Sequence, residues 1–323
     1  MENSPRLVVL DAATFGDAAL EPFAHWPCTI YPFSPPESVA ERLQGHSAAA
    51  INKVVLDRAT LRHPAAKDLK LIAVAATGTD NVDLDAARSL GIGVCNVPGY
   101  ATQSVAQFTM ALILELASHA GAYARRVREG AWEKSPVFTL LDYSCVELAT
   151  KTLGIIGYGN IGKAVASMAR GFGLDIRLSA RPGTTDPLTP GRLPLEEVLR
   201  EADFLTLHCP LTADTKNLID ARALNLMKPG AFLINTARGA LVDTTALIEA
   251  LRSGHLAGAA LDVLTQEPPS LHHPLIEAAR ELENLLITPH CAWATREARQ
   301  RLIAEVAKNI AAFERGGQRN RVV

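Results

Sequence analysis

The sequence predicts an α/β fold of two domains, each built on a parallel sheet with helices on both faces. Its 323 residues correspond to roughly two domains of ordinary size. Short apolar runs alternate with helical patterns along the chain, and this alternation indicates parallel sheets because parallel strands need crossover connections, usually helices. A glycine-rich turn at residues 152–163 marks the start of the second of two such series.

The first series covers residues 1–99. Its apolar runs are short enough for buried strands, and Pro98 and Gly99 end the last of them. We expect strands at residues 7–10, 29–31, 50–56, 71–75 and 93–97, with helices at residues 37–44 and 83–90. Because this block has no glycine-rich phosphate motif, we expect a smaller, flavodoxin-like doubly wound domain that does not bind a nucleotide.

A long helical pattern follows at residues 102–129. It begins with a Thr/Ser cap, and the segment from Val105 to Leu116 is apolar nearly all the way round. A helix of this kind is buried, so we expect to find it in a core or in an interface.

The glycine-rich turn has G-x-G-x-x-G spacing, with Gly157, Gly159 and Gly162 between an apolar run and a helical pattern. In a dinucleotide site the first glycine permits the tight turn, the second lets the backbone approach a pyrophosphate, and the third lets helix and strand pack closely. The amides of Asn160 and Ile161 would face the phosphates at the start of the helix. Such spacing alone arises by chance in roughly one chain in ten at this glycine content. The motif therefore indicates a dinucleotide site only if the surrounding strands and helices also fit one.

The second series supplies those elements. We expect strands at residues 153–156, 176–179, 204–207, 231–234, 257–261 and 285–287, with helices at residues 161–172, 195–201, 220–226 and 244–253. Six strands with helical crossovers fit two βαβαβ halves, which is the doubly wound Rossmann sheet. We therefore expect a dinucleotide-binding domain at residues 100–292.

An amphipathic helix is expected at residues 295–315. We expect it to fold back onto the first domain, which would make that domain discontinuous, with residues 1–99 plus 293–323. The chain would then cross between the domains twice, near residues 98–101 and near residues 289–292.

Composition narrows the class of protein. The net charge is −2, from 32 basic and 34 acidic residues, and no basic block suggests a nucleic-acid or membrane-surface partner. The five cysteines are widely spaced without a C-x-x-C pair, which is typical of free thiols in a reducing cytoplasm. The N-terminal segment is polar and no apolar run reaches about 18 residues. We expect a cytoplasmic globular protein.

Side chains that could carry chemistry follow the strands of the second series. Arg238 follows the strand at 231–234, Asp262 and Glu267 follow the strand at 257–261, and His290 follows the strand at 285–287. Ligands of open parallel sheets bind at the carboxyl ends of the strands. We therefore expect these four side chains to face one crevice.

The motifs that carry these residues resemble those of the D-2-hydroxyacid dehydrogenase family, and most closely its hydroxypyruvate reductase (glycerate dehydrogenase) branch. They appear in the family's order over nearly the whole chain. Besides the glycine motif they are Ala-Thr-Gly-Thr-Asp-Asn-Val-Asp at 76–83, Asn-Val-Pro-Gly-Tyr at 96–100, Ser-Val-Ala-Gln at 104–107, His-Cys-Pro-Leu-Thr at 208–212, Asn-Thr-Ala-Arg-Gly at 235–239, Ala-Leu-Asp-Val at 260–263, Glu267-Pro268 and Pro-His-Cys-Ala-Trp at 289–293.

The resemblance implies roles for these residues. Arg238 would bind the substrate carboxylate and carbonyl oxygen, which suits an always-charged guanidinium with bidentate geometry. His290 would exchange the proton with the substrate oxygen, because an ordinary histidine titrates near neutrality. Glu267 would orient the ring and favour its protonated form. The backbone amides of Thr77 and Gly78, from the first domain, would hold the substrate carboxylate.

The same resemblance implies a nicotinamide cofactor and a homodimer formed through the nucleotide-binding domains. The cofactor would contact Asn160 and Ile161 at its pyrophosphate and Asp262 at its carboxamide. Its ribose and adenine side would meet Cys209, Pro210 and Thr215, and its nicotinamide side would meet Thr236, Ala237 and Arg238.

One position departs from the pattern of NAD-specific members. Those carry an Asp or Glu at the end of the second strand, where it binds the ribose hydroxyls. This chain has Ala180 there, followed by Arg181. A missing carboxylate and a nearby guanidinium favour a 2′-phosphate, so we expect NADP to be preferred, with NAD as the alternative.

We thus expect hydride transfer between NAD(P)H and a small 2-oxo acid, from hydroxypyruvate or glyoxylate to D-glycerate or glycolate. No metal is needed in this scheme because Arg238 and His290 supply the positive charge. One alternative is a relative acting on another 2-hydroxy acid, on formate or on phosphite, although the retained Glu267 disfavours formate. The other alternative is an NAD(H)-sensing, corepressor-like binding protein.

Overall fold

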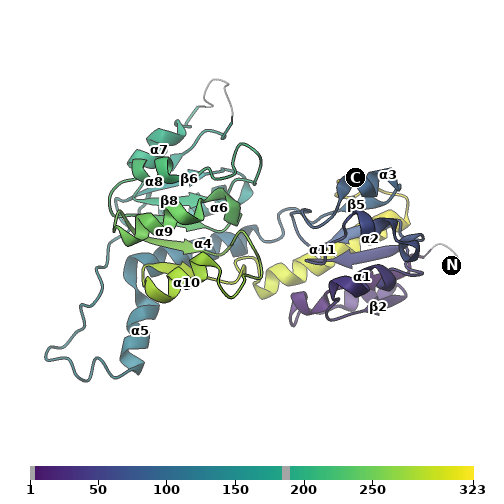
Figure 1. Ribbon diagram of the computed structural model, residues 1–323, viewed down its shortest axis with the longest axis horizontal. Coiled ribbons are helices and arrows are strands. Elements are labelled where there is room, and N and C mark those ends of the chain that lie inside the picture. The colour runs from purple at the N-terminus through teal and green to yellow at the C-terminus, as the bar shows by residue number, and fades with distance from the viewer. Residues whose placement is uncertain (1–3, 184–189) are drawn as a thin grey trace. The chain divides into compact units, whose positions relative to one another are not determined.

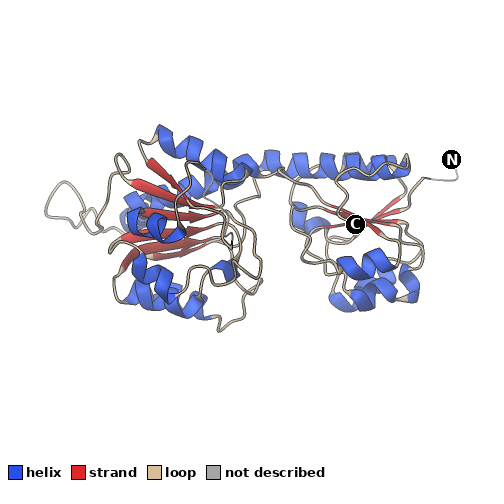
Figure 2. Cartoon of the chain, turned by 90° about the horizontal axis from the view of Figure 1, so that it is seen from above, coloured by secondary structure: helices blue, strands red, loops and turns tan. Residues whose placement is uncertain are grey.

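The computed structural model describes residues 4–183 and 190–323. The chain divides into two compact units, Met1–Ala101 with Ala294–Val323, and Thr102–Trp293. Each unit contains one sheet, and all strand pairs in both sheets are parallel. Helices cover both faces of each sheet (Figure 1, Figure 2). The predicted class, two doubly wound α/β domains, is confirmed.

The first unit has a five-stranded sheet in the order β2-β1-β3-β4-β5, which is the flavodoxin-like order. Its strands are β1 (Leu7–Val9), β2 (Cys28–Ile30), β3 (Ala48–Ile51), β4 (Leu71–Val74) and β5 (Gly93–Cys95). Its helices are α1 (Pro36–Arg42), α2 (Arg58–Arg62), α3 (Leu84–Ser89) and α11 (Arg296–Glu314), with 3-10 turns at Ala12–Phe15, Glu21–His25 and Pro64–Ala66.

The long C-terminal helix α11 belongs to this first unit, where it packs against β4. Leu302, Ile303 and Val306 are fully buried on its inner face. Helices α1 to α3 cover the opposite face of the sheet, through a core that includes Val39, Leu61 and other apolar side chains. A parallel sheet buried on both faces explains why its strands read as continuous apolar runs instead of alternating patterns.

The second unit has a six-stranded sheet in the order β11-β10-β9-β8-β6-β7. Its strands are β6 (Thr152–Ile156), β7 (Asp175–Leu178), β8 (Phe204–Leu207), β9 (Ala231–Asn235), β10 (Leu256–Leu261) and β11 (Leu285–Ile287). Its helices are α4 (Thr102–Ser118), α5 (Ala120–Arg128), α6 (Asn160–Gly171), α7 (Leu195–Glu201), α8 (Ala221–Leu226), α9 (Thr244–Arg252) and α10 (Pro274–Glu281), with a 3-10 turn at Gly239–Leu241.

The strand order of this sheet reverses between β6 and β8, next to the glycine-rich turn. Helices α4 and α6 cover one face and helices α7 to α10 cover the other, each over its own apolar core. Among the described residues no further strand lies on the outer side of β7, and Leu193 makes only an isolated bridge with Ser179. The two halves of the sheet are therefore less symmetric than two complete βαβαβ units.

The prediction of one helix over residues 102–129 is wrong. The chain breaks at His119, whose φ of 52° is left-handed, and the bend between α4 and α5 is 62°. The Glu115 carboxylate accepts hydrogen bonds from the amides of Gly121 and Ala122, which caps the new helix and stabilises the break. In the described part of the chain no single helix is long and apolar enough to cross a membrane, and only the bent pair α4–α5 passes that test by length and composition.

The other differences from the sequence-based prediction are smaller. Most element ends differ by one or two residues. The apolar run at residues 50–56 is not one strand: β3 ends at Ile51, and Leu56 makes an isolated bridge with Val82. Helices α2 and α10 were not predicted, because each is too short to show a clear helical period in the sequence.

Candidate active site

The glycine-rich turn joins β6 to α6 and is closely packed on two sides. Gly157 has a φ of 93°, and a Cβ atom there would lie 2.4 Å from the backbone nitrogen of Cys209. A Cβ atom on Gly162 would lie 2.2 Å from the carbonyl oxygen of Gly157. By contrast, a Cβ atom on Gly159 would have no atom within 4 Å. The open side at Gly159 fits the close approach of a pyrophosphate to the backbone.

Helix α6 begins directly after this turn. Its N-cap is Gly159, which provides no side-chain cap, and its first turn has no acidic residue. The first amides of a helix, here those of Asn160 and Ile161, have no acceptor within the helix, and the helix dipole favours an anion at this end. The residues present therefore fit the pyrophosphate of a dinucleotide.

Arg238 is held in the loop that follows β9. The Asn235 amide nitrogen donates to the Arg238 carbonyl oxygen over 2.8 Å, and the Ala237 amide donates to the Asn235 Oδ1 atom over 3.0 Å. A Cβ atom on Gly239 would lie 2.1 Å from the carbonyl carbon of Leu264, so glycine lets this loop pack against the loop after β10. The half-buried Arg238 side chain donates from Nη1 to the carbonyl oxygen of Ala237 over 2.8 Å.

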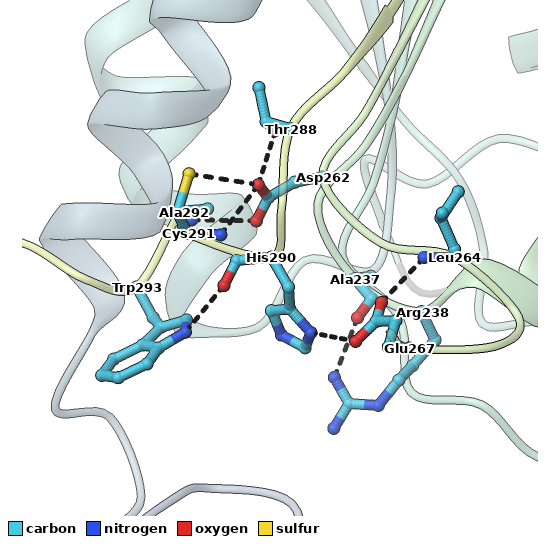
Figure 3. A network of polar contacts seen from close by, with 10 residues as sticks. All are labelled: Ala237, Arg238, Asp262, Leu264, Glu267, Thr288, His290, Cys291, Ala292 and Trp293. Carbon is cyan, nitrogen blue, oxygen red and sulfur yellow. Dashed lines mark hydrogen bonds and ion pairs between the residues drawn. The ribbon is translucent and has the colours of Figure 1, made fainter. Parts of the chain in front are cut away.

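Glu267 and His290 form a direct side-chain pair. The His290 Nδ1 atom lies 2.5 Å from the Glu267 Oε2 atom, and the exposed fractions of the two side chains are 27% for His290 and 33% for Glu267. The other carboxylate oxygen of Glu267 accepts from the Leu264 amide over 2.8 Å. Figure 3 shows the Arg238 guanidinium beside this pair. The structure thus brings together three of the four residues predicted at the strand ends, with the imidazole and the guanidinium next to one carboxylate.

The fourth of these residues, Asp262, lies at the end of β10 and is 1% exposed. Its carboxylate accepts hydrogen bonds from the turn that carries His290, between Thr288 and Ala292. Burial and the Asp262 charge raise the pKa of the Cys291 thiol in this turn, so we expect that thiol to stay protonated near neutral pH. Contact between Asp262 and a nicotinamide carboxamide stays a prediction.

The residues expected on the adenine side lie in the loop after β8. The Thr215 hydroxyl donates to the carbonyl oxygen of Pro210 over 2.8 Å and accepts from the Thr212 amide over 2.7 Å, so it holds the loop itself together. Burial raises the pKa of the Cys209 thiol to about 11 and lowers the pKa of the His208 ring. Both side chains are therefore uncharged at neutral pH, and no acidic side chain lies among residues 208–212.

A further cationic side chain lies at the end of β7, where the sequence predicted only Arg181. Arg192 donates to the carbonyl oxygen of Ser179 over 2.9 Å, and its guanidinium carbon lies 5.0 Å from the ring centre of Tyr158, inside the glycine motif. The backbone of Ala180 is fixed by a bond to Leu193 over 2.8 Å. No sequence pattern identified Arg192, because it belongs to no motif and lies well beyond the end of β7 along the chain.

The other residues predicted to contact the cofactor or the substrate lie near α4 and in the first unit. Thr236 is buried and its hydroxyl lies 3.1 Å from that of Thr109 on α4. Thr77 and Gly78 belong to the first unit, in the loop after β4, where the Thr77 hydroxyl donates to the carbonyl oxygen of Val97 over 3.0 Å. Their contact with a substrate stays a prediction. Among residues 4–183 and 190–323, no group of three or more His, Cys, Asp or Glu side chains is arranged to hold a metal ion.

Comparisons with known proteins identify the family of the chain. The family described as D-isomer specific 2-hydroxyacid dehydrogenase, NAD binding domain, matches residues 110–292. The chain is 46% identical to a glycerate dehydrogenase of Methylorubrum extorquens over 88% of both chains. It is 43% identical to a glyoxylate reductase of Thermococcus litoralis over 78% of this chain and 76% of the other.

A similar fold occurs among solved structures. The crystal structure of the TT0316 protein from Thermus thermophilus matches with a TM-score of 0.86 and 38% identity, over 98% of this chain and all of the other. The resemblance inferred from the motifs is confirmed. The chain belongs to the D-isomer specific 2-hydroxyacid dehydrogenase family, which consists of nicotinamide-dependent oxidoreductases.

Proposed function

We propose that this protein reduces a small 2-oxo acid, hydroxypyruvate or glyoxylate, to the D-2-hydroxy acid or glycolate. The cluster of Arg238, Glu267 and His290 carries the proposal, because a guanidinium that would bind a carboxylate lies beside an imidazole that would donate a proton. The similar glycerate dehydrogenase and glyoxylate reductase support the choice of substrate. Within the residues that the structure describes, the site has no feature that favours the corepressor-like alternative.

Arg238 would bind and orient the substrate. A guanidinium presents parallel N–H donors that match the two oxygens of a carboxylate, and it stays charged at every working pH. The loop bonds from Asn235 fix the backbone of Arg238, so the cation is in place before the substrate arrives. A preorganised cation also stabilises the negative charge that develops on the substrate oxygen during reduction.

His290 would donate the proton. The Glu267 carboxylate accepts from Nδ1, which leaves Nε2 to carry the proton that moves to the substrate oxygen. The same contact would hold the ring in one orientation. When bound, the nicotinamide supplies the hydride that reaches C2 of the substrate. In the oxidation direction, His290 would take the proton back.

A panel of 2-oxo acids tests this proposal. Absorbance of the reduced cofactor would be followed with hydroxypyruvate, glyoxylate, pyruvate and a branched 2-oxo acid, each with NADPH and NADH. We expect the largest kcat/KM with hydroxypyruvate or glyoxylate. A higher kcat/KM for the branched acid would contradict the proposed substrate class, and no oxidation with any acid would contradict the reaction.

We further propose that NADPH is the preferred cofactor. The end of β7 has no carboxylate at Ala180 and has two arginines close by, Arg181 and Arg192. Replacing either arginine with alanine should lower kcat/KM for NADPH by about 10-fold, because one charge-assisted hydrogen bond to the 2′-phosphate is lost. The kcat/KM for NADH should stay unchanged. Arg170→Ala, in the last turn of α6, is the charge-matched control. A large NADH advantage in the wild type would contradict this proposal.

A homodimer is the assembly we propose. Helix α5 and the loop after it project from the second unit (Figure 1). The loop presents Phe138, 90% exposed, and Leu141, 84% exposed, which a second copy would cover. A hollow of about 720 Å³ beside α5, lined by side chains such as Leu116, Phe232 and Leu286, lies at the amino ends of β9 to β11 and offers further apolar surface.

The mass in solution tests the assembly. Light scattering after size-exclusion chromatography should give twice the chain mass of 34.6 kDa. Phe138→Asp places a charge in the proposed interface and should shift the protein toward the monomer. Val55→Asp, an exposed apolar position of the first unit, is the control that should leave the mass unchanged. A monomeric wild type would contradict the proposal. Cytoplasmic location and the absence of nucleic-acid and membrane partners stay predictions from the sequence.

A further inference from the structure

The loop after β4 presents two backbone amides, those of Thr77 and Gly78, whose peptide planes are fixed by the end of β5. The Ala76 carbonyl oxygen accepts from the Val97 amide over 2.9 Å. The Thr77 carbonyl oxygen accepts from the Asn96 Nδ2 atom over 2.7 Å. Both peptide bonds are trans, so each amide points away from the carbonyl oxygen of the residue before it. Holding the two carbonyl groups therefore sets the direction of both amides.

The same two amides are available to a ligand. Among residues 4–183 and 190–323, neither the Thr77 amide nor the Gly78 amide donates a hydrogen bond to a protein acceptor. The Thr77 hydroxyl is already engaged, because it donates to the Val97 carbonyl oxygen over 3.0 Å. Two oriented amides without an acceptor fit the oxygens of a carboxylate, which is the group that this loop would hold in the proposed reaction.

Asn96 is itself held by α11 and by the segment after it, residues 317–323. Its carbonyl oxygen accepts from the Asn309 Nδ2 atom over 2.9 Å, and its amide donates to the carbonyl oxygen of Asn320 over 3.2 Å. The Asn320 Nδ2 atom donates to the Asn309 Oδ1 atom over 3.0 Å, so the buried Asn309 side chain both donates and accepts. A chain of hydrogen bonds thus runs from Asn320 through Asn309 and Asn96 to the loop after β4.

The segment after α11 is fixed along β5, the last strand of the first sheet (Figure 1). Arg321 makes an antiparallel bridge with Cys95, and the Val322 amide donates to the Val94 carbonyl oxygen over 2.8 Å. Asn320 has a φ of 50°, in the left-handed region, where asparagine is more frequent than most other side chains. The pairing with β5 therefore fixes the backbone from which the Asn320 side chain reaches α11.

We propose that Asn309 and Asn320 are positioning residues for the substrate, on which they act through Asn96. Their hydrogen bonds aim the Thr77 and Gly78 amides at the carboxylate of the 2-oxo acid. The inference rests on the proposed function and deepens it, because it makes substrate affinity depend on α11 and the segment after it. All of these contacts lie within the first unit.

Asn320→Gly is the first test, because glycine keeps the left-handed backbone and loses only the side-chain donor. We expect KM for hydroxypyruvate to rise by roughly 2- to 5-fold, at the low end of the loss of one hydrogen bond. A contact with the carboxylate acts equally on the bound substrate and on the transition state, so kcat should stay unchanged. The cofactor Kd should also stay unchanged, because the glycine-rich motif belongs to the second unit.

Asn309→Ala is the second test and removes both side-chain bonds. We expect the same pattern with a KM increase of roughly 5- to 20-fold. NMR of the protein without substrate reports the positioning directly. The nitrogen shift of an amide responds to the hydrogen bond on the preceding carbonyl group, so the Thr77 and Gly78 resonances should move in both variants.

Two controls loosen α11 without breaking the chain of hydrogen bonds. Arg319→Gln, next to Asn320, removes an ion pair with Glu305. Trp26→Phe removes the indole bond to Glu314, at the end of α11, over 3.1 Å. Either control can lower Tm, but neither should change KM or move the two amide resonances, since neither bond reaches the loop after β4.

The outcomes separate the explanations. A lower Tm with an unchanged KM in both variants would overturn the inference, as would a fall in kcat without a rise in KM. A cofactor Kd that weakens as much as KM rises would also overturn it. If Asn309→Ala does not fold, Asn320→Gly decides. If the wild type reduces no 2-oxo acid, the proposed function fails, and the NMR comparison still tests the positioning: unmoved Thr77 and Gly78 resonances in both variants reject it.

Discussion

Replacing His290 with glutamine lowers kcat for reduction by roughly 10²- to 10⁴-fold, which is the range that a positioned general acid contributes. Glutamine retains a polar side chain but cannot release a proton to the substrate oxygen. The Glu267 carboxylate would then face an amide in place of the imidazole. Steady-state kinetics with hydroxypyruvate and NADPH measure the effect, and the cofactor KM should change little.

A second histidine offers a control for this change. His255 precedes β10, at the opposite edge of the sheet, where its ring lies 3.0 Å from the carbonyl oxygen of Leu224. His255→Gln should retain the wild-type kcat. If His290→Gln retained more than about a tenth of the wild-type kcat, another group would have to donate the proton.

Replacing Arg238 with glutamine should lower kcat/KM for the 2-oxo acid by roughly 10²- to 10⁴-fold. The reason is the loss of two charge-assisted hydrogen bonds to the substrate, each worth about 1.5 to 3 kcal/mol. Arg238→Lys retains the charge but loses the planar fork, so we expect an intermediate value. The KM for the oxo acid should rise in both variants, while cofactor affinity measured by titration stays close to wild type.

The control for Arg238 is an arginine with only a surface partner. Arg252 lies at the end of α9 and pairs with Glu281 over 3.0 Å, with both side chains mostly exposed. Arg252→Gln should be indistinguishable from wild type, because exposed ion pairs contribute little. Equal kcat/KM in the Arg238→Gln and wild-type proteins would remove Arg238 from substrate binding.

Much of the fold follows from the sequence because buried parallel strands are short apolar runs. The strands β8 and β11 have the predicted bounds, and the glycine spacing identified the turn before α6. The candidate site was also predictable in outline. Arg238, Glu267 and His290 each follow a strand, and the carboxyl ends of parallel strands lie on one edge of the sheet.

Other features depend on contacts that no sequence pattern indicates. The break at His119 depends on the Glu115 carboxylate, whose hydrogen bonds to the next helix are visible only in the fold. The turn around His290 depends on Asp262, which lies far away in the sequence and on a different strand. Arg192 reaches β7 through its side chain and not through a motif. In each case a tertiary contact of one polar side chain decides the local backbone or the local charge.

We propose that His290, held in contact with Glu267, donates the proton during reduction. The most direct measurement is the pH dependence of kcat/KM for reduction, in the wild type and in Glu267→Gln. The protonated ring is the active form, so the rate falls as the pH rises. Because a carboxylate beside an imidazole attracts the charged ring, its removal should move the alkaline limb to lower pH. An alkaline limb at the same pH in both proteins would contradict the account.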